Sequence, residues 1–176
     1  MIELSAQKIA TKIKEMNPEE TASIEVMKFS LIMIISTLVT LTTSLFLAFL
    51  FGVLFETITV LFTFALLRFF SGGFHFKSAE LCITATVLGS VILPLISKYT
   101  HFSWLLTIIS ILLLLLFSPR GKNQSRIFEK KHFPLLKIIS IVIVGANFLI
   151  GSELLALTFF IQSITLLFVK GGEYNV

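Results

Sequence analysis

The residues best able to do chemistry in this chain lie within one short segment, from Arg68 to Cys82. His75 offers a base and Cys82 a thiol, and Gly72-Gly73 stand just before them. Cys82 is the only cysteine, so it forms no intramolecular disulfide and no cysteine metal cage. Such a thiol is either a small buried hydrophobe or a nucleophile that a nearby base activates.

The spacing decides how His75 and Cys82 can meet. In one straight helix, side chains seven residues apart share a face but are separated by about 10.5 Å along the axis, too far for a hydrogen bond. Gly72-Gly73 permit positive φ angles, so the chain can turn and bring His75 back toward Cys82. We expect this turn at the membrane surface and not in a packed span, so Gly73→Val is predicted to cost little stability.

The start of the next helix bears on the thiol. Ser78 is a candidate N-cap, which places Cys82 in about the second helical turn. The helix dipole there favours a thiolate, and the neighbouring Glu80 opposes this effect.

The elements that must hold this segment are membrane helices. The chain of 176 residues is 56% hydrophobic and 14% charged, with a mean hydropathy of +0.98, whereas soluble domains carry about 25% charged residues. A span needs about 20 apolar residues, and a barrel needs period-two alternation, which is not seen here. We predict a single-domain (1–176) all-α membrane protein with about six spans, some of them short, at 28–51, 53–70, 79–97, 102–117, 135–151 and 153–169.

Residues 1–16 form a separate amphipathic segment. Apolar residues recur at spacings of three and four, and lysines and Glu15 take the other side: the apolar set is Ile2, Ala6, Ile9, Ile13 and Met16. This pattern is typical of a helix in the membrane interface.

The basic residues predict the orientation. With the amino terminus in the cytosol, thirteen of the fourteen Lys and Arg residues fall on the cytosolic side, and Lys98 alone falls outside. The positive-inside rule then places both termini in the cytosol of a multi-pass cell-membrane protein. Basic residues at the ends of apolar segments indicate contact with anionic membrane lipids, not with nucleic acid.

The pattern Arg68-x3-Gly72-Gly73-x-His75-x6-Cys82 in a small six-span chain resembles the accessory gene regulator B family. These are membrane endopeptidases that process the propeptide of a Gram-positive quorum-sensing signal. The resemblance implies that Cys82 is the nucleophile, that His75 is the base, and that Arg68, Gly72 and Gly73 are needed for activity. It also implies an AgrD-like propeptide substrate, a cyclic thiolactone product, a homodimer and no cofactor.

The loop after the fourth span is a second place where the chain is similar to that family. Family members often carry a Pro, a polar run, a second Pro and basic residues, but Gln124-Ser125 stand where the second Pro is expected. The loop either handles the propeptide or simply fixes topology and touches anionic lipid. The residues that match are Pro119, Lys122, Asn123, Lys130 and Lys131.

The alternative function is a non-enzymatic membrane transporter or exporter of a small peptide or solute. Its coupling groups would be intramembrane acids, but Glu56 and Glu153 lie near the outer ends of their spans, where we expect them to be solvated. Asn147 and Gln162 are expected to form hydrogen bonds between helices.

A metal site is not expected either. His101 and His132 fall on opposite sides of the membrane, Asp is absent, and there is no H-E-x-x-H motif. The His75 and Cys82 pair, together with the family resemblance, predicts a membrane cysteine endopeptidase.

Overall fold

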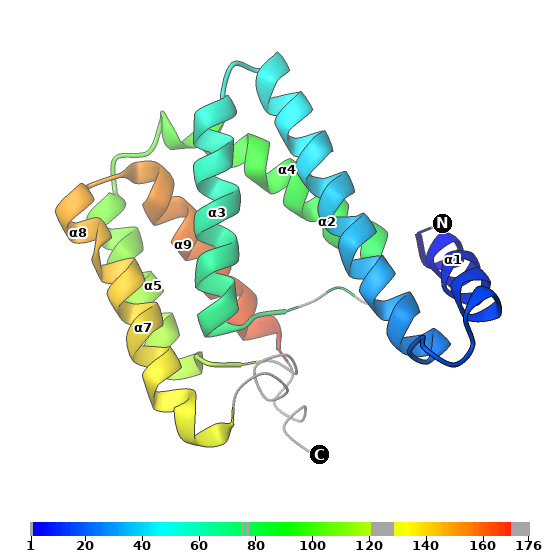
Figure 1. Cartoon of the computed structure of the whole chain (residues 1–176). Helices are drawn as coiled ribbons and strands as arrows, with labels where there is room; N and C mark the ends of the chain where they lie inside the picture. The colour runs from blue at the N-terminus through cyan, green and yellow to red at the C-terminus, as the bar shows by residue number, and fades with distance from the viewer. Residues whose placement is uncertain (1, 75, 77, 121–128, 170–176) are drawn as a thin grey trace.

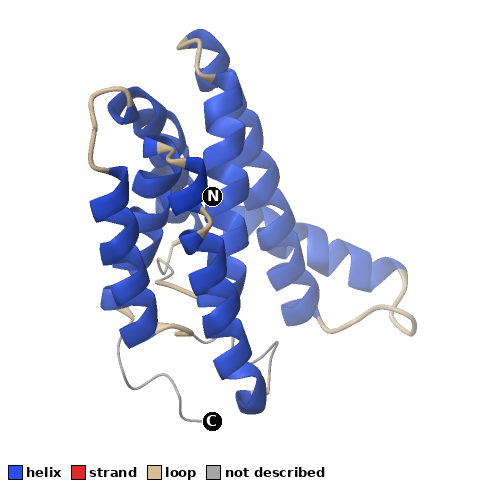
Figure 2. Ribbon diagram, turned by 90° about the vertical axis from the view of Figure 1, so that its left-hand side faces the viewer, coloured by secondary structure: helices blue, strands red, loops and turns tan. Residues whose placement is uncertain are grey.

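The computed structural model describes residues 2–74, 76, 78–120 and 129–169. Within these ranges the chain forms helices and loops and, apart from one isolated bridge, no β-structure (Figure 2). The predicted all-α membrane fold is confirmed. The elements are α1 (Ile2–Met16), α2 (Ile24–Leu50), α3 (Leu54–Ser71), α4 (Ala79–Ser97), α5 (Ser103–Phe117), η1 (Lys130–His132), α7 (Phe133–Gly145), α8 (Asn147–Ile150), α9 (Glu153–Thr165) and η2 (Leu166–Phe168).

Among the described residues, four helical stretches are long and apolar enough to cross a membrane. They are α2, α3, α4 and the 18-residue stretch Phe133–Ile150 formed by α7 and α8. The other two predicted segments are shorter apolar helices, Ser103–Phe117 and Glu153–Phe168. At 1.5 Å per residue, fifteen residues extend about 22 Å, less than the roughly 30 Å of a typical hydrocarbon layer. The protein is therefore multi-pass, and the count of six spans stays a prediction.

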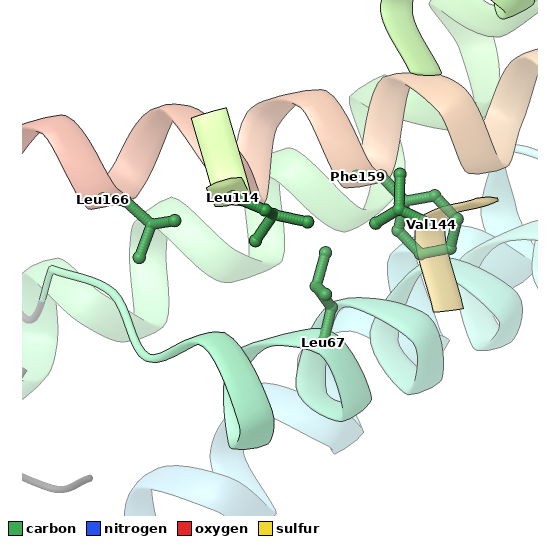
Figure 3. Packing of buried hydrophobic residues seen from close by; sticks show 5 residues of the cluster. All are labelled: Leu67, Leu114, Val144, Phe159 and Leu166. Atoms are coloured by element: carbon green, nitrogen blue, oxygen red, sulfur yellow. The ribbon is translucent and has the colours of Figure 1, made fainter. Parts of the chain in front are cut away.

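Two groups of helices pack beside each other (Figure 1). In the first, α3, α5, α7 and α9 surround a core in which leucines dominate; its buried residues are Leu67, Leu114, Val144, Phe159 and Leu166 (Figure 3). In the second, α2 and α4 pack around Ala48, Val53 and Val91. Contacts of α4 with α3 and α9 join the groups. Leu67 lies one turn before the end of α3, so the first core fixes the place where the diglycine begins.

A proline in α4 explains a hydrogen bond between helices in the second group. Pro94 has no backbone N–H, so it cannot donate to the carbonyl of Ser90 four residues earlier. The Thr57 hydroxyl of α3 donates to that carbonyl at 3.1 Å. The Ser90 hydroxyl lies 3.1 Å from that of Ser44 in α2. Polar side chains thus tie α2, α3 and α4 together where α4 lacks a bond of its own.

The predicted amphipathic segment is helix α1, which lies at the edge of the molecule against α2 (Figure 1). Its small residues Ala6 and Ala10 are fully buried, whereas Ile9 and Met16 are exposed. The predicted apolar face is therefore divided, because Ala6 packs on the protein whereas Ile9 and Met16 stay exposed. The first residue of the helix reaches α4, since the Ile2 amide lies 3.4 Å from Glu80 Oε1.

Candidate functional site

The diglycine after α3 adopts the backbone that the sequence predicts. Helix α3 ends at Ser71, and Gly72 and Gly73 have φ angles of 77° and 147°. Residues with a Cβ rarely take such angles. Both glycines are buried, so the expectation that the turn lies outside the packed part of the protein is wrong. It failed because α9, ninety residues further along the chain, covers the turn.

Gly73 has no room for a side chain. A Cβ built on it would lie 2.7 Å from Thr165 Oγ1, 3.1 Å from Gln162 Nε2 and 3.3 Å from Arg68 Nη1. Glycine is therefore required at position 73 for two reasons: the φ angle is one that other residues rarely adopt, and the packed atoms leave no space for a Cβ.

The diglycine also pairs with Arg120, which lies in the loop after α5; this loop, rich in basic residues, is called the basic loop. The Gly73 amide donates to the Arg120 carbonyl at 2.9 Å, and the Arg120 amide donates to the Ser71 carbonyl at 3.0 Å. These two bonds form a parallel bridge between Gly72 and Arg120. The Arg120 guanidinium lies 5.1 Å from the centre of the Phe117 ring. The sequence offered no signal for this pairing, because it joins two loops that are far apart in the chain.

Two polar side chains hold the backbone around Gly73. The Gln162 amide group donates to the Gly72 carbonyl at 2.6 Å. The Arg68 guanidinium donates to the Phe74 carbonyl, and its Nη1 lies 3.5 Å from Gln162 Oε1. The expectation that Gln162 bonds between helices is confirmed, but its place in the candidate site was missed. A usable signal was present: Gln162, Ser163 and Thr165 are polar residues in an apolar segment.

Cys82 lies at the start of α4. Ser78 takes the N-cap position without a side-chain cap bond, and the Cys82 amide donates to the Ser78 carbonyl at 3.2 Å. Cys82 is the fourth residue of α4 and begins its second turn, as expected. The Ser78 hydroxyl donates to Glu80 Oε2 at 2.7 Å. Cys82 is a half-buried free thiol. His75 lies outside the described residues, so its contact with Cys82 stays a prediction.

The predicted residues of the basic loop are only partly described. Pro119 is buried and lines a hollow of about 360 Å³ between the end of α5 and the start of α7. Lys131 is exposed and pairs with Glu129 at 2.5 Å, an arrangement that contributes little to stability. Lys122 and Asn123 lie outside the described residues, as does the side chain of Lys130.

Asn147 and Glu153 lie near the start of α9, at the opposite end of the bundle from the diglycine. The Asn147 amide group donates to the Thr107 hydroxyl at 3.0 Å, which confirms it as a bond between helices. The expectation that Glu153 is solvated is wrong for one oxygen: within the described ranges its Oε2 is buried without a hydrogen-bond partner. In the same part of the chain, no three His, Cys, Asp or Glu side chains lie together as metal ligands would.

Comparison with known proteins gives one consistent result. The family model described as accessory gene regulator B matches residues 6–169. A protein of Halalkalibacterium halodurans described as AgrB-like is 24% identical over 193 residues, which cover 99% of this chain and 98% of that protein. A second AgrB-like protein, from Clostridium perfringens, is 27% identical over 103 residues, covering 58% of this chain and 48% of that protein. No solved structure matches the chain.

Proposed function

The chain belongs to the accessory gene regulator B family, and from this premise we propose that it is a membrane cysteine endopeptidase. Membership of this family indicates a membrane protein that takes part in processing a quorum-sensing propeptide. Its nucleophile is Cys82, its general base is His75, and its substrate is an AgrD-like propeptide. One observation carries the proposal: the only thiol of the chain is half-buried at the start of α4, and the buried diglycine before it is followed by Phe74, whose carbonyl accepts a hydrogen bond from Arg68.

The first step is acylation of the enzyme. His75 takes the proton of Cys82, and the thiolate attacks a peptide carbonyl of the propeptide, forming a carbon–sulfur bond. The carbon–nitrogen bond then breaks, and His75 returns its proton to the leaving amine. The product is a thioester that holds the amino-terminal part of the propeptide.

The second step closes a ring and frees the enzyme. A substrate thiol gives its proton to His75, attacks the thioester carbonyl and displaces Cys82 as a thiolate. One thioester is exchanged for another, so the free-energy change is small. Release therefore depends on holding the substrate thiol close to the thioester and keeping water away from it.

The arrangement in the membrane is part of the proposal. Both termini and the diglycine segment face the cytosol, where the propeptide is made, and the family resemblance supports a homodimer. The charge distribution supports this orientation, with thirteen basic residues on one side and Lys98 on the other. Reporter fusions after residues 76 and 125 are expected to report the cytosol, and a fusion after residue 99 the outside. A cytosolic result at residue 99 would contradict the six-span arrangement.

Replacement of the nucleophile tests the function. Cys82→Ser is expected to abolish propeptide cleavage while the protein accumulates normally in the membrane, because serine is far less acidic than cysteine and a neutral hydroxyl is a weak nucleophile. Cleavage is followed by the mass of the propeptide in cells that produce both proteins. Undiminished cleavage by Cys82→Ser would eliminate the cysteine peptidase and favour the transporter.

A further inference from the structure

A buried glutamine of α9 reaches the diglycine from across the bundle. Gln162 is 0% exposed. Its amide group donates to the Gly72 carbonyl at 2.6 Å and to Ser71 Oγ at 3.2 Å. Its oxygen accepts from Arg68 Nη1 at 3.5 Å and from Thr165 Oγ1 at 3.4 Å. Three of these four contacts thus lie at the end of α3 or in the diglycine itself.

Arg68 completes the arrangement on the far side of Gly73. Its Nη2 donates to the Phe74 carbonyl. The carbonyls of Gly72 and Phe74, which flank Gly73, are therefore each held by one of two side chains, and those side chains contact each other. Phe74 is the residue directly before His75 in the chain. Arg68 and Gln162 together thus hold the described backbone from Gly72 to Phe74, which precedes His75 in the chain.

The neighbour of Gln162 shows that burial alone does not create such bonds. Ser163 is also 0% exposed, yet within the described ranges its hydroxyl has no hydrogen-bond partner. An unpaired buried amide is costly, whereas an amide whose donor and acceptor are both engaged is tolerated and fixes its partners in place. The two residues thus form a natural pair for comparison: equal burial on one helix, but different bonding.

We propose that Gln162 is a positioning residue for the chemistry of Cys82. It fixes the Gly72 carbonyl, and it orients the Arg68 guanidinium, which holds the Phe74 carbonyl. This inference rests on the proposed function, because the consequence of a misplaced segment is poor activation of Cys82 by His75.

The single thiol of the chain allows a test without any substrate. The purified full-length protein, in lipid nanodiscs, is alkylated with iodoacetamide from pH 6 to pH 10, and the modification of Cys82 is followed by mass spectrometry. In Gln162→Met, which keeps the volume but lacks both bonding groups, we expect alkylation at pH 7 to slow on the order of tenfold. The rates should converge at high pH, where a thiol ionises without a base. Ser163→Ala, the matched control, should follow the wild-type curve.

Two results would overturn the role of Gln162. One is a Gln162→Met curve that coincides with wild type at every pH. The other is a change by the same factor at every pH, which would indicate altered access to the thiol instead of altered activation. The variant His75→Ala distinguishes failure of the role of Gln162 from failure of the proposed function on which it rests. If His75→Ala slows alkylation and Gln162→Met does not, only the inference fails; if neither slows it, the base assignment fails and the role of Gln162 with it.

A second variant keeps the test decisive if Gln162→Met does not accumulate. Gln162→Glu retains the size and an acceptor for Arg68, but its carboxylate cannot donate to the Gly72 carbonyl, so slowed alkylation is again expected. Combination with Arg68→Lys adds a coupling measurement. If Gln162 acts through Arg68, the double variant should lose little more than the worse single variant. Fully additive losses would contradict a shared action.

Discussion

The two sides of the connection between α3 and α4 are built differently. On the diglycine side, the backbone is buried and is bonded to Arg120 and to Gln162 of α9. On the Cys82 side, the bonds are mostly local: the Cys82 amide to the Ser78 carbonyl, and the Ser78 hydroxyl to Glu80. A long-range hydrogen bond there joins the Ile2 amide of α1 to Glu80.

This difference means that the two proposed halves of the site belong to different packing groups. The segment leading to His75 is part of the α3, α5, α7 and α9 group, whose core includes Leu67 and Leu166. Cys82 is carried by α4, which packs mainly on α2. We infer that the diglycine side, held by its bonds to Arg120 and Gln162, is the fixed side of the site. Helix α4 then places the Cys82 thiol next to it. Disturbance of the fixed side should therefore damage the chemistry most.

Gly73→Ala should give the largest effect. The new Cβ would meet Thr165 Oγ1 at 2.7 Å at a residue with a φ of 147°, so the segment must shift. We expect propeptide cleavage to fall by at least about a hundredfold and the free energy of unfolding to fall by roughly 1–3 kcal/mol. Cleavage assays and thermal unfolding in detergent measure the two quantities.

Gly89→Ala is the control for that substitution. Gly89 lies within α4, the helix that carries Cys82, and a Cβ there meets no atom within 4 Å. Cleavage should be unchanged, and the free energy of unfolding should stay equal or rise by about 0.5–1 kcal/mol, since alanine favours helix over glycine. Equal cleavage by Gly73→Ala and Gly89→Ala would show that the fixed side does not position the chemistry.

Thr57→Val should give a smaller effect of another kind. It removes the donor to the Ser90 carbonyl, which Pro94 leaves without its helical partner. We expect the free energy of unfolding to fall by about 1–2 kcal/mol, with cleavage changed less than about threefold, because Ser90 lies about 12 Å along α4 from Cys82. Thr59→Val is the control, because the exposed Thr59 hydroxyl donates to the Phe55 carbonyl within α3. A tenfold loss of cleavage at unchanged stability would show instead that the far end of α4 controls the thiol.

The sequence predicted mostly what is local; of the distant contacts it predicted that Asn147 and Gln162 bond between helices, but not their partners. Apolar runs and turn residues predict the helices, and the chemistry of glycine predicts the positive φ angles at Gly72 and Gly73. Ser78 was placed correctly at the N-cap position, but its hydroxyl bonds to the Glu80 side chain and not to a backbone amide of the helix. The burial of Gly73 and its bonds to Arg120 and Gln162 depend on how α5 and α9 pack. No spacing within the segment from Arg68 to Cys82 encodes that packing. The short lengths of α5 and α9 were visible in the sequence, but their packing partners were not.

Trapping of the acylated enzyme tests the central claim that Cys82 is the nucleophile and forms a thioester with the propeptide. The purified protein is mixed with a propeptide whose ring-forming residue is replaced by alanine, so that the second step is blocked. The reaction is quenched in acid, and the fragment containing Cys82 is weighed by mass spectrometry. We predict an adduct of the amino-terminal part of the propeptide on Cys82, released by neutral hydroxylamine and absent from Cys82→Ala. Cleavage of the propeptide with Cys82 still unmodified would contradict nucleophilic catalysis by this residue.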